Sequence, residues 1–181
     1  MSTDVSTREQ VPFRLRTADG DTVEGVAIDN SPFLAYSDGI FLTSPDATYQ
    51  VENTRVLGIR GTSDPSEHGD ALQVPTAAAL KVDGFTATTS GQGIFMRPDT
   101  GPIGSIEVRN ADISVFNDTM PGAVNVGGDA LFFLNAASTR TAANNYQWAA
   151  GSIAFANTYV HSVRSYTDIV YPWTYEPSQR T

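Results

Sequence analysis

The sequence is poor in metal-binding and basic side chains. Its 181 residues include no cysteine, one lysine and two histidines, and the histidines belong to no HxH or HExxH motif. The absence of cysteine excludes disulfides, thiolate ligands and a cysteine nucleophile, so we expect no metal site and no cofactor. With 11 basic and 20 acidic residues, the net charge is −9. Because a nucleic-acid groove needs clustered Lys and Arg, we expect no nucleic-acid partner.

Long apolar segments are also missing. No apolar run reaches the roughly 18 residues of a membrane-spanning helix, and the first residues, MSTDVSTREQ, lack the charged-then-apolar pattern of a signal peptide. We therefore expect a soluble chain without a membrane partner.

Catalytic motifs are absent as well. The sequence has no G-x-S-x-G elbow, and TSGQGIF (residues 89–95) lacks the third glycine of a nucleotide-binding loop. Carboxylates and arginines that polysaccharide cleavage could recruit are present, but no pair stands out. They are Asp83, Asp99, Asp112, Asp118, Arg97 and Arg109. We predict no catalytic residues and no enzyme.

What the chain does contain favours β-structure. Apolar residues make up 40% of it, and Thr, Val, Ser, Gly and aromatic residues outnumber the good helix formers. We predict an all-β fold with four segments: an N-terminal arm (residues 1–10), a small barrel (11–60), a linker rich in Gly, Pro and Ser (61–78) and a second β domain with an aromatic tail (79–181).

The front segment alternates apolar and polar residues in short runs. VPFRLRT and TVEGVAI flank ADGD, in which Asp19-Gly20 suits a tight turn, so we predict an antiparallel hairpin here. Further short strands follow up to RVLGI (residues 55–59). The order of strands resembles that of SH3-like barrels.

The rear segment repeats one phrase, [A/S]-[I/L]-x-[V/F]-x-[G/N]. It occurs at Ala79, Ser105, Ala130 and Ser152, with spacings of 26, 25 and 22 residues. A repeat of this length predicts the coils of a parallel β-solenoid, stacked in register. Eight apolar side chains then point inward: Leu80, Val82, Ile106, Val108, Leu131, Phe133, Ile153 and Phe155. The last position of each phrase, Gly84, Asn110, Asn135 or Asn157, turns the chain, and the Asn amides could bond from coil to coil.

Charges between the inward positions agree with stacking. Lys81 would lie beside Glu107 and Asp83 beside Arg109, which pairs opposite charges on neighbouring strands. The phrase is degenerate, however, and Greek-key strand pairs also fit its intervals. A jelly-roll or β-sandwich is therefore the alternative.

The coil pattern resembles the right-handed parallel β-helix of pectate lyases and viral tailspikes over residues 79–170. Two coils carry apolar residues in outward positions, namely Phe132, Leu134, Ala154 and Ala156. Such a strip needs a cover, either the aromatic tail with Tyr171, Trp173 and Tyr175 or another subunit. We predict that these seven residues form an oligomer interface and that the chain is a homotrimer.

A compact β protein of this kind also resembles virion components of tailed viruses, such as capsid decoration, turret or tail-attachment proteins. The resemblance implies a location in the virion and a capsid or tail protein as partner, whereas the alternative locations are secreted or cytoplasmic. A carbohydrate-binding or carbohydrate-cleaving β-helix that recognises a surface glycan is the alternative function.

Overall fold

The computed structural model describes eight stretches of the chain: residues 13–15, 21–32, 38–61, 69–96, 103–116, 132–135, 153–161 and 170–173. Side chains are described in all of them except 13–15, 132–135 and 170–173. The strands are β1 (Phe13–Leu15), β2 (Asp21–Glu24), β3 (Ala27–Asp29), β4 (Ile40–Thr43), β5 (Thr48–Ile59), β6 (Asp70–Thr89), β7 (Gln92–Met96), β8 (Ile103–Val115), β9 (Phe132–Asn135), β10 (Ile153–His161) and β11 (Val170–Trp173). No helix occurs in these stretches, so the all-β prediction is confirmed.

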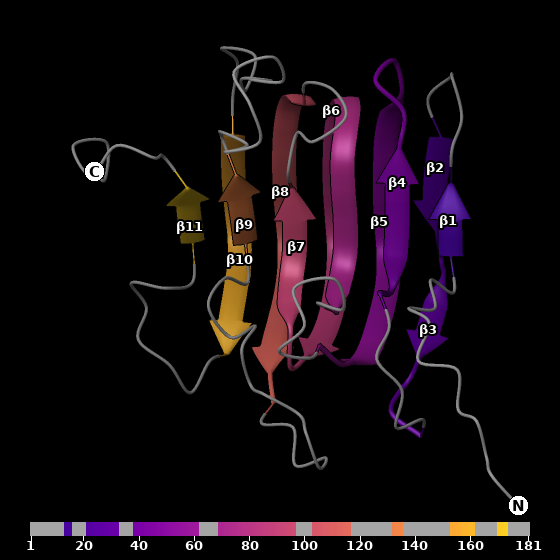
Figure 1. Cartoon of the computed structure of the whole chain (residues 1–181), viewed down its shortest axis with the longest axis vertical. Helices are drawn as coiled ribbons and strands as arrows, with labels where there is room; N and C mark the ends of the chain where they lie inside the picture. The colour runs from indigo at the N-terminus through magenta and orange to yellow at the C-terminus, as the bar shows by residue number, and fades with distance from the viewer. Residues whose placement is uncertain are drawn as a thin grey trace, which may run out of the picture.

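All pairings between these strands are parallel, and they build two sheets. The first sheet contains β1, β4, the start of β6, β7, β9 and β11. The second sheet contains β2, β3, β5, the rest of β6, β8 and β10. Figure 1 shows them as two rows, one behind the other, whose strands point in opposite directions. The chain alternates between the rows and moves one strand along with each pass, which differs from the antiparallel jelly-roll or sandwich alternative.

The predicted N-terminal hairpin is wrong. β1 pairs with β4 in the first sheet, whereas β2 and β3 both pair with β5 in the second. Alternation of apolar and polar residues is the same for a hairpin strand and for a strand in a parallel coil with one face buried. The pattern therefore located the strands but could not show that β1 and β2 belong to different sheets.

The predicted linker ends earlier than expected. Residues 70–78 form the first part of β6, and Asp70, Leu72 and Val74 are buried there. Side chains from β2 through β8 pack into a single hydrophobic core, from Val23 to Ile113. The parts of the chain before and after the predicted linker share this core, because β6 contributes to both sheets and pairs with β5 along most of its second part.

The predicted columns hold for three of the four phrases. In the second sheet Leu80, Ile106 and Ile153 are in register, and Ile106 is 1% exposed. The phrase at Ala130 is the exception, because β9 lies in the first sheet between β7 and β11. Its Phe132 and Leu134 are in register with the buried residues Ile94 and Met96. They are therefore not neighbours of Ala154 and Ala156, as the predicted strip required.

A column of left-handed backbone conformations crosses the second sheet. Gly25 has a φ of 65°, Asn53 47°, Gly84 72°, Asn110 49° and Asn157 50°. The pairing registers on either side of these residues place them beside one another, and we call them the bend column. Asn110 Nδ2 donates to Asp83 Oδ1 at 2.7 Å, and Asn157 Nδ2 donates to Asn110 Oδ1 at 3.1 Å. The amide contact predicted between Asn110 and Asn157 is thus present, whereas Asn135 lies in β9 in the other sheet.

Candidate functional site

The outer surface of the second sheet presents two rows of polar side chains. Gln50, Lys81 and Glu107 form one row across β5, β6 and β8. The row two positions further along each strand contains Glu52, Asp83 and Arg109. Because Val51, Val82 and Val108 alternate with them and are buried in the core, these six polar residues face outward. We call this surface the polar face.

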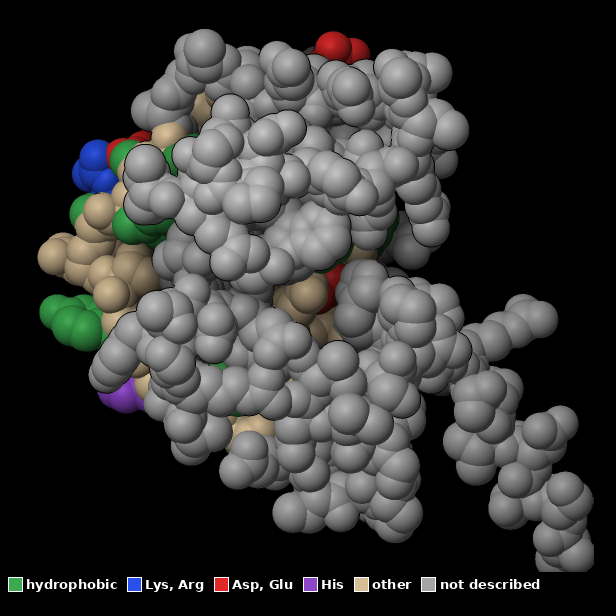
Figure 2. Space-filling model, turned by 60° about the vertical axis from the view of Figure 1, so that its left-hand side comes forward, with side chains coloured by type: hydrophobic (Ala, Val, Ile, Leu, Met, Phe, Trp, Pro, Cys, Tyr) green, Lys and Arg blue, Asp and Glu red, His purple; other side chains and the backbone are tan. Residues whose placement is uncertain are grey.

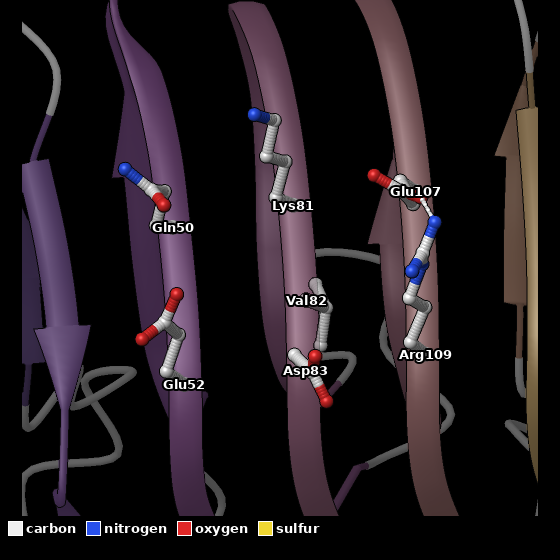
Figure 3. A pocket seen from close by; sticks show the side chains of 7 residues that line it. All are labelled: Gln50, Glu52, Lys81, Val82, Asp83, Glu107 and Arg109. Atoms are coloured by element: carbon white, nitrogen blue, oxygen red, sulfur yellow. Dashed lines mark ion pairs between the residues drawn. The ribbon is translucent and has the colours of Figure 1, made fainter.

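The polar face is hollowed between its rows. An open depression of about 190 Å³ is lined by Gln50, Glu52, Lys81, Val82, Asp83, Glu107 and Arg109. Figure 3 shows these residues along three adjacent strands, with the long side chains standing off the sheet. Small-molecule pockets usually enclose roughly 300–1,000 Å³. The depression is therefore too small to enclose a typical small molecule. It is better suited to contact one side of a polar ligand at the surface.

The charges on this face follow the predicted register, but their contacts differ from the prediction. Lys81 is paired with Glu107 and Asp83 with Arg109 in the ladder between β6 and β8. The Arg109 guanidinium, however, forms its ion pair with Glu107 on its own strand, as Figure 3 shows. Asp83 instead accepts the hydrogen bond from Asn110 in the bend column. An ion pair between exposed side chains contributes little to stability, so this arrangement mainly sets the charge pattern of the surface.

The carboxylates considered for polysaccharide cleavage do not converge in the described ranges. Asp83 lies before the bend column on β6, whereas Asp112 lies after it on β8, beside Thr86. Asp112 Oδ1 contacts His161 Nε2 at 3.2 Å, and both side chains are exposed. Arg97, Asp99 and Asp118 lie outside the described residues.

The predicted oligomer interface is divided between the two sheets. Ala154 and Ala156 are exposed and extend the polar rows, since they pair with Glu107 and Arg109. Tyr171 and Trp173 lie in β11, whose partner is β9 in the first sheet, and Tyr175 lies outside the described residues. The side chains of Phe132 and Leu134 also lie outside the described set. These seven positions therefore do not form one strip.

The structure instead exposes apolar side chains on β10. Ile153 is 45% exposed, Phe155 38% and Tyr159 63%, and these are the large exposed hydrophobic residues among the described side chains. Burial predicted for Ile153 and Phe155 is wrong because β10 has a strand, β8, on one side only in the described part of the second sheet. Figure 2 shows hydrophobic side chains projecting at the left of the molecule, near a histidine. No sequence pattern identified β10 as an edge, since its phrase is the same as that of an interior coil.

Comparison with protein-family models, curated proteins and solved structures finds no significant match to the chain. Within the described stretches, no group of three or more His, Asp or Glu side chains is placed to hold a metal ion. The same stretches contain no helix long and apolar enough to cross a membrane.

The charge pattern of the polar face gives a first test. Arg109→Glu removes the ion pair with Glu107 and makes position 109 the third acidic side chain in a row with Glu52 and Asp83. We expect the free energy of unfolding in urea to fall by about 1 kcal/mol at low salt, and to recover largely at molar salt. Arg109→Gln is the control, which should lose less. Equal, salt-independent losses for both variants would show that repulsion plays no part.

Proposed function

We propose that the chain is a non-enzymatic structural protein of a virion, built as a two-sheet parallel β-helix and held in a capsid or tail through its sheet edges. The observation that carries the proposal is the exposure of Ile153, Phe155 and Tyr159 on one edge strand. An exposed apolar edge is a template for another chain, and soluble proteins usually protect such edges. The resemblance to viral tailspikes supplies the virion setting, and it alone supports a trimer, because the predicted apolar strip is divided between the sheets.

Labelling of virus particles tests the proposed location. Antibodies against the purified chain are applied to tailed-virus particles from cultures of the organism that carries the gene, and gold label is viewed by electron microscopy. We expect label on the capsid or the tail, and peptides of the chain in density-purified particles at a constant ratio to the major capsid protein. Peptides confined to the cell lysate would overturn the proposal.

Glycan binding is the second candidate, and the depression on the polar face favours it. A row of amide, carboxylate and basic groups on an exposed sheet can form hydrogen bonds to several sugar hydroxyls without enclosing them. A glycan array tests binding, and assay of released reducing ends separates binding from cleavage. Lys81→Ala should weaken binding, whereas Arg55→Ala, which changes an exposed residue beyond the bend column, should not.

A further inference from the structure

The two ends of the second sheet are complementary edges. In the described residues β10 pairs only with β8, and β2 and β3 pair only with β5. All these strands run parallel, so a second copy moved along the row of strands would present its β2–β3 edge parallel to β10 (Figure 1). Parallel strands can then continue the sheet from one copy into the next.

Both edges carry the same backbone bend. β10 bends at Asn157, with a φ of 50°, and the β2–β3 edge bends at Gly25, with a φ of 65°. A straight strand could follow β10 on one side of Asn157 only, whereas a strand with a left-handed residue at the same place follows it throughout. Of the described strands outside β5, β6, β8 and β10, only the β2–β3 edge has this bend.

Alignment of the two bends also matches apolar side chains at two inward positions of β10, although it places Ile153 beside Asp21. Extending the ladder register by one strand places Phe155 beside Val23 and Val160 beside Ile28. Val23 and Ile28 lie on the core side of the sheet, where Val23 is buried and Ile28 packs against the core. The exposed apolar side chain of Phe155 would therefore join a continuous interior.

The register also places an imidazole beside a carboxylate on the outer face. His161 would lie beside Asp29, and His161 already contacts Asp112 of its own chain. Asp29 is exposed, and hydrogen bonds from the side chain and the backbone N–H of Ser31 lower the pKa of its carboxyl group. The carboxylate is therefore ionised at neutral pH and can accept a hydrogen bond from the imidazole of another copy.

We propose that copies of this chain associate head to tail, with β10 of one copy pairing with the β2–β3 edge of the next. The proposal rests on the assembly role given to β10 above and names its partner as a second copy. Because the two surfaces differ, the contact is heterologous, so it leads to rings or filaments and not to a closed dimer.

A two-fold contact between two β10 strands fits less well. Antiparallel pairing about Asn157 would place Phe155 opposite Tyr159. Phe155 is in register with buried Val108, whereas Tyr159 is in register with exposed Asp112, so the two side chains belong to opposite faces of the sheet. Residues directly opposite one another in a ladder point to the same face of the sheet. Antiparallel pairing of two β10 strands would therefore not bring Phe155 and Tyr159 into contact.

The test uses one blocking substitution on each edge of the full-length chain. Phe155→Lys places an inward-pointing charge on β10, a natural means of preventing strand addition. Ala27→Pro removes an N–H on the other edge. Arg55 N donates to Val26 O at 2.9 Å while Ala27 is its ladder partner, so the N–H of Ala27 points away from β5. Ala154→Lys and Ala27→Ser are the matched controls, and far-UV circular dichroism verifies that each variant folds. Ile153→Glu replaces Phe155→Lys if the latter does not fold, because the aligned register places position 153 beside Asp21 of the next copy.

Mass is measured by light scattering after size exclusion over a wide range of concentrations. We expect the mass of the native chain and both controls to increase with concentration, and each blocked variant to remain at the mass of one chain. An equimolar mixture of Phe155→Lys and Ala27→Pro retains one good edge on each partner, so it should form a species of twice the chain mass and nothing larger.

Three results would overturn the proposal. A native chain of single mass at all concentrations would mean that another segment of the same chain, or another partner, covers β10. Dimers of Ala27→Pro would indicate pairing between two β10 strands, and a mixture that stays monomeric would exclude the complementary contact. None of these results bears on the presence of the chain in virus particles, which the labelling experiment measures separately.

Discussion

Replacing Ile106 with aspartate is expected to lower the free energy of unfolding by about 4 kcal/mol. Ile106 is 1% exposed and lies in β8 between Leu80 and Ile153, within the hydrophobic core. A carboxylate at this position would be buried without a charged partner, because its neighbours in the column are aliphatic. Since domains of this size are stable by roughly 5–15 kcal/mol, a large part of the population would be unfolded at moderate urea concentrations.

The same substitution one strand further along provides the control. Ile153 is the ladder partner of Ile106, but it is 45% exposed at the edge of the sheet. Ile153→Asp should therefore cost under about 1 kcal/mol when measured on dilute, monomeric protein, because the carboxylate stays in water. Urea unfolding followed by far-UV circular dichroism gives both values. Similar large losses for both variants would mean that β10 is covered like an interior strand.

The sequence was informative where neighbouring strands repeat the same residue types in register. Leu80 and Ile106, and Asn110 and Asn157, occupy equivalent positions because parallel stacking brings like residues together. The same repetition assigns the charged residues of the polar face to adjacent strands from the sequence alone, namely Lys81, Asp83, Glu107 and Arg109.

Two errors come from the residue types on the strands. Strands of both sheets alternate apolar and polar residues, so the phrase beginning at Ala130 matched the pattern although β9 belongs to the first sheet. Conversely, TYQVEN in β5 did not match the repeat, because Thr48 stands where the pattern requires Ala or Ser and the buried Tyr49 stands where it requires Ile or Leu. Gln50, Glu52 and Asn53 of this segment were therefore not assigned to the repeat. The contribution of β5 to the polar face was not predicted for the same reason. Volume in the core, and not a fixed residue type, is what this position requires.

The close approach of chain segments at one corner of the fold leads to the second large effect. Gly91 lies between β6 and β7, and a Cβ atom added there would be 2.1 Å from the carbonyl oxygen of Gly69. The same oxygen accepts a hydrogen bond from Gln92 N at 2.8 Å, while Gly91 N donates to Thr89 Oγ1 at 2.8 Å. A side chain at Gly91 therefore cannot be accommodated by rotation of a neighbour, since the obstacle is backbone. The two segments have to separate.

Gly91→Val should accordingly destabilise the chain by about 3 kcal/mol, the upper part of the range for overpacking, through strain and through loss of the Gln92 hydrogen bond. Gly25→Ala is the informative comparison, because a Cβ at Gly25 meets no atom within 4 Å and only its φ of 65° is unfavourable. That conformation costs an alanine about 1 kcal/mol. Gly25→Asn should be nearly neutral, because Asn53, Asn110 and Asn157 adopt the same conformation in the bend column.

Urea midpoints should rank Gly91→Val as the least stable variant, then Gly25→Ala, then Gly25→Asn. This order would separate two reasons for glycine, a close backbone contact and a left-handed backbone conformation. If Gly91→Val were as stable as Gly25→Ala, the segments at this corner would have to lie further apart than the structure places them.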